Sequence, residues 1–480
     1  MAVQELGCYI DGAMHVPQSG EVVAVTSSAT GEPIANVAIA SRHEVTMAVV
    51  AARRARAEWS EVGPWQRAEI CHRIGDAIAR RIDEFAELHT LEQGKPLSES
   101  IADIKEASQL YHLHAEDLLR LHGETMPSSD PKKRMFTFYR PVGTWAIITP
   151  WNFPVLMMAE FVAPGLATGN AHIGKPPTHT AMTVLATLEC FEEAGVPSGL
   201  VNVLPGGGEL GDLLVTHPEI DAVGFIGSSA TGARIQSRSG LKRTVMECSG
   251  NGPLIVCSDA DLAKAAKAAV YGAYFCAGQV CCATERVLVD ASIHDEFVSL
   301  CLSEAEKVRL GDPFDNDTML GPLNNQEVAK KMDRHLADAR THGASILTGG
   351  GRRPGMPTDL YYELTVIDDV REEMLVAQEE TFGPVVPILS ASGDEELLAI
   401  ANRDPLGLQA AVFTESTRRA YFFMEKLRVG QVIVNDSTGF WDINMPFGGA
   451  GGSATGWGRL GGKYTLMEMS DLRTGVIDLS

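Results

Sequence analysis

The sequence has little of what marks membrane, secreted or nucleic-acid-binding proteins. Its longest stretch without a charged residue, residues 141–159, is broken by Pro150 and Pro154 and predicts buried strand and loop rather than a membrane span. Glu5 and Asp11 lie where a signal peptide needs an apolar segment. The 40 basic residues are outnumbered by 62 acidic ones, and the net charge of −22 would repel a phosphate backbone. We therefore expect neither a membrane nor a nucleic acid as a partner.

Disulfide scaffolds, zinc sites and two common catalytic signatures are also missing. The nine cysteines have no framework spacing, which is typical of a cytoplasmic protein with reduced thiols. There is no GxxxxGK[ST] segment, which disfavours a P-loop NTPase, and no GxSxG segment, which disfavours an α/β-hydrolase. His112 and His114 are two positions apart on an expected helix, so their rings should point apart. We expect no metal site.

What remains is an ordinary globular composition, with 45% apolar and 21% charged residues among 480. A chain of this length is expected to form more than one domain. Short apolar runs at residues 171–173, 200–204, 222–225 and 254–256 alternate with helical stretches. This alternation predicts an α/β fold with parallel sheets. Glycine and proline around Gly250 indicate a division between two α/β domains.

Residues 275–286 contain a candidate nucleophile. An expected helix breaks at Ala277 and Gly278, and Cys281 and Cys282 follow in a segment without a periodic pattern. A cysteine in such a place can act as a nucleophile if local dipoles stabilise its thiolate. Two buried structural cysteines would give the same pattern, so these residues alone leave both interpretations open.

Three further segments are suggestive but individually weak. Gly227 and Ser228 lie between an expected strand and helix, where backbone N–H groups can approach a pyrophosphate, although the spacing is not GxGxxG. Asn152 is fixed in a loop between two prolines and could donate to a developing oxyanion. Glu247, flanked by apolar residues, could be a general base with a raised pKa. Packing turns and paired acids would look the same.

In this order, the segments resemble those of the aldehyde dehydrogenase superfamily over essentially the whole chain. Seven ordered matches over about 300 residues are very specific, whereas each alone is weak. The matching segments are Pro150-Trp-Asn-Phe-Pro154, Gly174-Lys-Pro176, Phe225-Ile-Gly-Ser228 with Gly232, Glu247, Gly278-Gln-Val-Cys281, Glu379-Glu-Thr-Phe-Gly-Pro384 and Pro446-Phe-Gly-Gly449.

The resemblance implies NAD(P)-dependent oxidation of an aldehyde to a carboxylic acid. It assigns Cys281 as the nucleophile that forms a thiohemiacetal and then a thioester, Asn152 as an oxyanion donor, and Glu247 as the base for deacylation. It implies NAD or NADP as the cofactor, held by Trp151, Lys175, Thr178, Gly227, Ser228, Gly232, Glu380 and Phe382. It implies a substrate tunnel lined by Met157, Phe161, Val280, Cys282, Phe440, Trp441 and Phe447.

Some residues depart from the family pattern. Thr178 stands where the family usually has an acid that binds the ribose and repels a 2′-phosphate. Without that acid, NADP as well as NAD is a candidate cofactor. Phe161 stands where a basic residue is common, and the usual acidic partner of that residue would be Asp471, so a proton-relay pair is expected to be missing. The loop after the base carries Cys248 and Ser249 in place of the usual leucine and glycine.

The resemblance also implies three structural parts. A β element should pair the strand at 134–139 with the tail at 465–478, and such an exposed strand implies a homodimer or homotetramer. The parts are a Rossmann-like cofactor-binding domain at 1–122 and 142–249, an α/β catalytic domain at 250–448, and an oligomerisation element at 123–141 and 449–480.

The sequence is compatible with two classes of aldehyde substrate. Residues 311–323 look like those of semialdehyde dehydrogenases, whereas the aromatic residues expected in the tunnel favour an apolar or aromatic aldehyde. A catalytically silenced homologue with a binding or structural role is a further alternative, which the presence of Cys281, Asn152 and Glu247 disfavours. A CoA-acylating enzyme is another, which Glu247 disfavours because such enzymes typically lack the deacylating acid.

Overall fold

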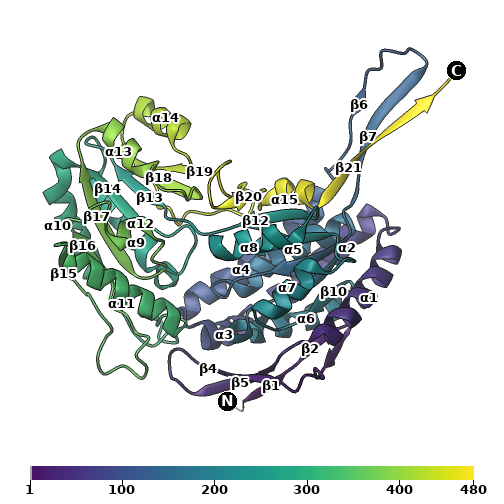
Figure 1. Cartoon of the computed structure of the whole chain (residues 1–480), viewed down its shortest axis with the longest axis horizontal. Coiled ribbons are helices and arrows are strands. Elements are labelled where there is room, and N and C mark those ends of the chain that lie inside the picture. The colour runs from purple at the N-terminus through teal and green to yellow at the C-terminus, as the bar shows by residue number, and fades with distance from the viewer. Residues whose placement is uncertain (1–2) are drawn as a thin grey trace.

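The computed structural model describes residues 3–480, and their strands form two large and two small sheets (Figure 1). The first large sheet is made of β2 (Cys8–Ile10), β3 (Ala13–His15), β8 (Thr144–Ile148), β9 (Ala171–Lys175), β10 (Val201–Val203), β11 (Ala222–Ile226), β12 (Arg243–Glu247) and β20 (Gly456–Trp457). Its order is β20-β12-β11-β8-β9-β10-β2-β3. The run from β12 to β10 is parallel, and antiparallel strands complete both edges.

The second large sheet is parallel except at one edge, where β15 is antiparallel. It is made of β13 (Pro253–Val256), β14 (Arg286–Asp290), β15 (Ser345–Thr348), β16 (Thr365–Asp368), β17 (Val385–Ala391), β18 (Gln409–Phe413) and β19 (Gln431–Val434). Its order is β15-β16-β17-β14-β13-β18-β19.

The central strands explain the short apolar runs in the sequence. Every residue of β8, β9, β11, β13 and β14 is buried, as expected for parallel strands that helices cover on both faces. The predicted α/β fold is therefore confirmed. The helices are α1 (Arg42–Trp59), α2 (Pro64–Ala79), α3 (Ile82–Gln93), α4 (Leu97–Leu118), α5 (Pro154–Thr168), α6 (Met182–Ala194), α7 (Gly208–Thr216), α8 (Ser229–Ser239), α9 (Leu262–Tyr274), α10 (His294–Ala305), α11 (Gln326–Thr341), α12 (Leu375–Gln378), α13 (Asp394–Ala401), α14 (Thr417–Lys426) and α15 (Gly462–Glu468), with 3-10 turns η1 (Thr178–Thr180), η2 (Phe275–Gly278) and η3 (Ala291–Ile293).

The α5 helix is the most important for the site. It follows β8, begins with Pro154 at its first position, and packs against α4 and α2. Nearly all of its residues are buried, including one carboxylate, Glu160. None of the helices in the described part of the chain is both long and apolar enough to cross a membrane.

The two small sheets lie at the margins of the molecule. One joins β1 (Gln4–Leu6), β5 (Pro33–Ala38) and β4 (Val22–Thr26). The other joins β6 (Thr125–Met126), β7 (Lys133–Pro141) and β21 (Ser470–Asp478) and projects away from the body (Figure 1). The pairing of β7 with β21 confirms the expected pairing of strand and tail. Within 449–480, β20 pairs with β12 and so extends the first large sheet rather than the projecting one.

Candidate active site

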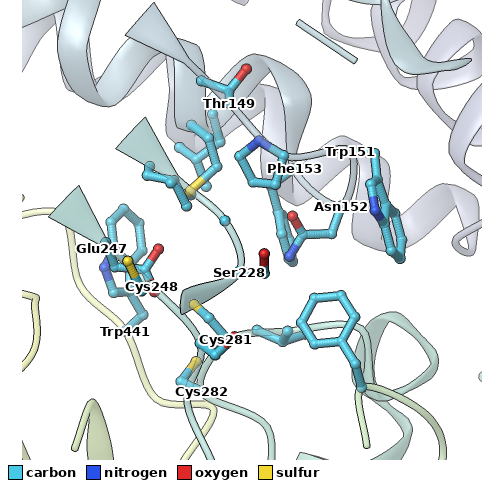
Figure 2. A pocket seen from close by; sticks show the side chains of 18 of the residues that line it. Thr149, Trp151, Asn152, Phe153, Ser228, Glu247, Cys248, Cys281, Cys282 and Trp441 are labelled. Atoms are coloured by element: carbon cyan, nitrogen blue, oxygen red, sulfur yellow. The ribbon is translucent and has the colours of Figure 1, made fainter. Parts of the chain in front are cut away.

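A cavity of about 860 Å³ lies where strands and loops of both large sheets end. The segments that follow β8, β11 and β12 line it from the first sheet, together with the loop after α9 and the segment around Phe382. Ligands of open α/β sheets bind at the carboxyl ends of the strands. Figure 2 shows Asn152, Glu247 and Cys281 around this cavity.

The loop that carries Cys281 is held in an unusual backbone conformation. After α9 ends, Cys276 and Ala277 have φ values of 49° and 55°, and Gly278 has 71°. A non-glycine residue in this region costs roughly 1–2 kcal/mol, so the surrounding structure must enforce it. A Cβ on Gly278 would lie 2.2 Å from the carbonyl oxygen of Gly383, so the loop presses directly on the segment after Phe382. Cys281 is thus placed by a strained turn.

Cys281 lies beside two groups that affect its proton. An interaction with the Cys282 side chain, burial and the nearby Glu247 together raise the pKa of the Cys281 thiol well above its usual range. The resting group is therefore a thiol, and it needs a base to become a nucleophile. The carboxyl of Glu247 lies close enough to this thiol for each group to shift the pKa of the other. The loop that follows Glu247 also packs directly against Cys281. A Cβ on Gly250 of that loop would lie 2.1 Å from the Cys281 carbonyl oxygen.

Glu247 ends strand β12 and is 2% exposed. Burial raises its pKa to about 8, the Cys281 thiol opposes that rise, and the nearby Glu380 and Glu160 add to it. A carboxyl with a pKa near neutral pH can both accept and release a proton, which suits a general base.

Asn152 is fixed in the loop between β8 and α5. Its side-chain nitrogen donates a hydrogen bond of 2.9 Å to the carbonyl of Gln279, and the residue is 4% exposed. Gln279 is itself held, since its side chain donates to the carbonyl of Cys276 and accepts from the N–H of Asn324. A carboxamide has two N–H donors, so one remains for a ligand in the cavity.

The opposite part of the cavity fits a dinucleotide. Ser228 caps α8 and accepts from the N–H of Thr231, which places the positive end of the helix at the cavity wall. The ammonium of Lys175 is buried and donates to the carbonyl of Gly206, and burial lowers its pKa to about 8. An ammonium and a helix N-terminus are the groups that bind ribose and phosphate oxygens.

An aromatic pair bounds the same part of the cavity. Trp151 meets Phe382 edge to face, with ring centroids 5.5 Å apart. Phe382 has a φ of 59°, and the buried carboxyl of Glu285 holds it by accepting the N–H groups of Thr381 and Phe382, each at 2.9 Å. Glu380 accepts the N–H of Gly250 at 3.0 Å.

The structure brings most of the predicted site residues to the cavity. Thr178 and Gly232 do not line it, although their neighbours Pro177 and Thr231 do. Gly232 instead allows α8 to pack, because a Cβ there would lie 2.6 Å from the sulfur of Cys248. The predicted residues that line the cavity are Trp151, Asn152, Met157, Lys175, Gly227, Ser228, Glu247, Val280, Cys281, Cys282, Glu380, Phe382, Phe440, Trp441 and Phe447.

The prediction that Phe161 lines the substrate tunnel is wrong. Phe161 is 0% exposed and packs under the sheet, where a Cβ on Gly224 would lie 2.7 Å from its ring. Met157 and Glu160 of the same helix face the cavity, and one residue further turns a helical side chain by about 100°. Asp471, the expected relay partner, instead lies on β21 with Arg243 at 3.9 Å and Arg473 at 3.2 Å.

Sequence reasoning missed Glu160, Glu106 and Glu285. Glu160 and Glu106 line the cavity, and Glu285 supports its wall. A signal for Glu160 existed, because it is the one carboxylate of α5, a helix otherwise apolar on every face. Such a helix is buried all round, and a charged residue within it rarely lacks a partner or a function.

Two mostly parallel sheets that meet at a cavity with a nucleotide-type turn and a partly buried cysteine are typical of a dinucleotide-dependent oxidoreductase. The family model described as "Aldehyde dehydrogenase family" matches residues 15–474. Mitochondrial succinate-semialdehyde dehydrogenase of Arabidopsis thaliana is 36% identical over 94% of this chain and 85% of its own. Betaine aldehyde dehydrogenase of Bacillus subtilis is 34% identical over 97% and 96%.

Solved structures agree with the sequence comparisons. The crystal structure of betaine aldehyde dehydrogenase from Staphylococcus aureus in complex with NAD+ has a TM-score of 0.95 and 33% identity, and the match covers 99% of this chain and 95% of that one. The chain belongs to the aldehyde dehydrogenase family, whose members are NAD(P)-dependent oxidoreductases that act on aldehydes.

Proposed function

We propose that this protein oxidises an aldehyde to the carboxylic acid by covalent catalysis on Cys281. The observation that carries the proposal is the meeting of the Cys281 thiol, the Glu247 carboxyl and the Asn152 amide at one cavity wall. A nucleophile, a base within reach of it and an oxyanion donor are what thioester chemistry requires.

In the first half of the reaction Glu247 takes the thiol proton, and the Cys281 thiolate adds to the aldehyde carbon. The backbone N–H of Cys281 and the second N–H of Asn152 stabilise the alkoxide that forms. When bound, the nicotinamide supplies the hydride acceptor that turns this thiohemiacetal into a thioester. Cys281 keeps the acyl group covalently in place throughout.

Glu247 releases the thiol proton to solvent before the second half, in which it takes a proton from water and later returns it to the departing Cys281 thiolate. The hydroxide adds to the thioester carbon, the same two donors stabilise the oxyanion, and the Cys281 thiolate leaves. Over the cycle one aldehyde, one water and one oxidised cofactor give one carboxylate, one reduced cofactor and two protons. The presence of Glu247 at this position supports hydrolysis over transfer to CoA, and it also supports an active enzyme over a silenced homologue.

We propose that the cofactor is NAD or NADP. Lys175 and Glu380 would bind the ribose, the turn at Gly227 and Ser228 the pyrophosphate, and the pair of Trp151 and Phe382 the ring system. Thr178, in η1 beside Pro177, offers no negative charge to a 2′-phosphate.

We further propose a cytoplasmic homodimer or homotetramer built through the projecting β-sheet. Exposed apolar side chains on this sheet and the residues just beyond it support the assembly, since an uncovered apolar strand edge favours association. They are Phe138, Leu472, Val476, Ile477 and Leu479. Light scattering of the purified protein distinguishes the two states from a monomer. The division into a cofactor domain, a catalytic domain and this element is part of the same proposal.

The test is a panel of aldehydes with NAD and with NADP, read as reduced cofactor at 340 nm and as carboxylic acid by chromatography. The proposal predicts stoichiometric acid and reduced cofactor, no acyl-CoA when CoA is present, and no product from Cys281→Ala. Turnover by Cys281→Ala, or none by the wild type with any aldehyde, would contradict it.

A further inference from the structure

The part of the cavity away from the cofactor residues contains a carboxyl group without a partner. Glu160 is 1% exposed and lines the cavity from α5. Neither of its oxygens accepts a hydrogen bond from any group in the described part of the chain. The backbone N–H of Gly461 is near enough to affect its pKa but makes no hydrogen bond of good geometry with it.

Three other buried carboxyls of the described chain have partners for at least one oxygen, whereas both oxygens of Glu160 lack one. Glu285 accepts two backbone N–H groups, Glu92 accepts those of Met182 and Thr183, and Asp103 pairs with the ammonium of Lys95 at 3.2 Å. A buried carboxyl that lacks such partners costs several kcal/mol, so it contributes nothing to folding. Glu160 is therefore a candidate for a partner from outside the protein.

A second carboxyl lies close to Glu160. Glu106 lines the cavity from α4, and its charge acts on Glu160. Burial raises the pKa of Glu160 to about 8 and that of Glu106 to about 7. The charged groups that act on Glu106 are Asp103, Lys95, Asp442 and Lys105. Lys95 is already neutralised by Asp103 and does not line the cavity.

The cations of the cavity lie elsewhere. Among the residues that line it, within the described chain, Lys175 and Lys331 are the cationic ones and no arginine occurs. Lys175 belongs to the cofactor part, and the Lys331 ammonium lies 5.8 Å from the Phe382 ring centroid. A carboxylate tail on a substrate would therefore meet Glu160 and Glu106 with no positive partner.

The remaining wall is aromatic. Tyr271, Phe275, Phe440, Trp441 and Phe447 all line the cavity. Aromatic faces attract a cation within about 6 Å, and they bind a hydrocarbon chain equally well. Carboxyls at one end and aromatic rings along the side suit a chain that ends in an ammonium group.

We propose that the enzyme prefers aldehydes whose distal end carries a protonated amine, with Glu160 as the residue that binds the ammonium and Glu106 as a second negative charge behind it. The inference rests on the proposed aldehyde oxidation and adds the substrate class. The ammonium donates hydrogen bonds to Glu160 and restores its ionised form, so the otherwise unsatisfied carboxyl gains a partner only in the substrate complex.

The test compares kcat/KM for 3-aminopropanal, butanal and succinate semialdehyde, which differ mainly in the charge at the distal end. We expect 3-aminopropanal to exceed butanal by at least about tenfold, and succinate semialdehyde to be the poorest of the three. In Glu160→Gln the ratio of 3-aminopropanal to butanal should fall at least about tenfold, and Glu160→Asp should recover part of it.

Glu116→Gln is the control for the loss of one carboxylate, because Glu116 lies at the surface of α4, where it pairs with Arg120 and is outside the cavity. It should leave the ratio unchanged. Propylammonium offers a readout independent of turnover: it should compete with butanal in the wild type and bind at least about tenfold more weakly to Glu160→Gln.

The possible outcomes separate the two proposals. Equal or better use of butanal or succinate semialdehyde by the wild type, or an unchanged ratio in Glu160→Gln, overturns the amine preference and leaves aldehyde oxidation intact. Failure of all three aldehydes to reduce either cofactor overturns both. If Glu160→Gln does not fold, two measurements on the wild type still test the amine proposal. They are the preference for 3-aminopropanal over butanal and the inhibition by propylammonium.

Discussion

Glu285 and Glu160 are both buried carboxyls beside the same cavity, and they differ in what surrounds them. Glu285 accepts two backbone N–H groups and holds the turn at Phe382 on the cofactor side. Glu160, on the other side, has no partner in the described chain. The carboxyl on the cofactor side is therefore satisfied without a ligand, whereas the carboxyl on the substrate side is not. This difference is the basis for proposing a substrate group as the partner of Glu160.

The largest expected effect is the loss of activity on substitution of Cys281, which lies between the cofactor wall and the substrate wall. Cys281→Ala should abolish aldehyde oxidation, because no other group forms the covalent intermediate, while NAD binding measured by calorimetry stays within about threefold since the cofactor wall is untouched. Cys282→Ala is the control and should keep most of the rate. Loss of activity in Cys282→Ala with retention in Cys281→Ala would show that the neighbouring cysteine is the nucleophile.

Glu247→Gln should reduce the steady-state rate by roughly 10²–10⁴-fold, the usual contribution of a positioned base. Hydride transfer needs no water, so stopped-flow mixing should still show a slowed burst of about one reduced cofactor per site. The wild type should lose kcat/KM as the pH falls below about 8, because burial raises the pKa of Glu247 to that value and the protonated form is no base. If the burst of reduced cofactor and the steady-state turnover are both lost, the role of Glu247 is to deprotonate the Cys281 thiol and not to activate water.

Asn152→Ala should lower kcat by about 10²–10³-fold, or roughly 2.7–4 kcal/mol, because it removes one oxyanion donor. The change also removes the hydrogen bond to the carbonyl of Gln279. Circular dichroism and thermal unfolding identify any loss of structure. An effect on KM alone would place Asn152 in substrate binding rather than in stabilisation of the oxyanion.

The sequence predicted most of both walls, and the residues that do not line the cavity are Thr178 and Gly232 on the cofactor side and Phe161 on the substrate side. The cofactor wall and the loop of Cys281 consist of turns whose glycines, such as Gly250 and Gly278, are fixed by backbone contacts and leave a spacing that can be recognised. Part of the substrate wall consists of side chains from α4, α5 and α9, whose contacts depend on how the helices dock. Phe161 was assigned to it in place of Glu160, because a list of positions does not give the angle around a helix.

The cofactor wall offers a smaller test. Thr178 carries no charge, so wild-type kcat/KM for NADP should be within roughly tenfold of that for NAD. Thr178→Glu should shift preference toward NAD by about one to two orders of magnitude, or about 1.4–2.8 kcal/mol. Because Thr178 lies just outside the cavity lining, a wild type that already excludes NADP by about a thousandfold would show that another group guards the ribose pocket.

The smallest effects concern stability and compare the two carboxyls directly. At pH 6 Glu285→Gln should lower the melting temperature, because a buried N–H loses its acceptor at a cost of about 1–3 kcal/mol. Glu160→Gln should be neutral or stabilising, since Glu160 has no partner to lose.

The pH dependence of Glu160→Gln sharpens the comparison. Burial raises the pKa of Glu160 from 4.5 to about 8, so the folded wild type loses stability as the pH rises through that window. The advantage of Glu160→Gln in melting temperature should grow from pH 5 to pH 8 and then level off. A Glu160→Gln protein less stable than the wild type at pH 8 would reveal a partner for this carboxyl.

The central claim is that Cys281 carries the acyl group, and mass spectrometry tests it most directly. Glu247→Gln is mixed with an aldehyde and NAD, quenched in acid during the burst, digested and analysed by peptide mapping. The account predicts the acyl mass on Cys281 in a peptide that also contains Cys282, with fragment ions that place it on the first of the two. An acyl group on Cys282, or no modified peptide despite a full burst of reduced cofactor, would contradict it.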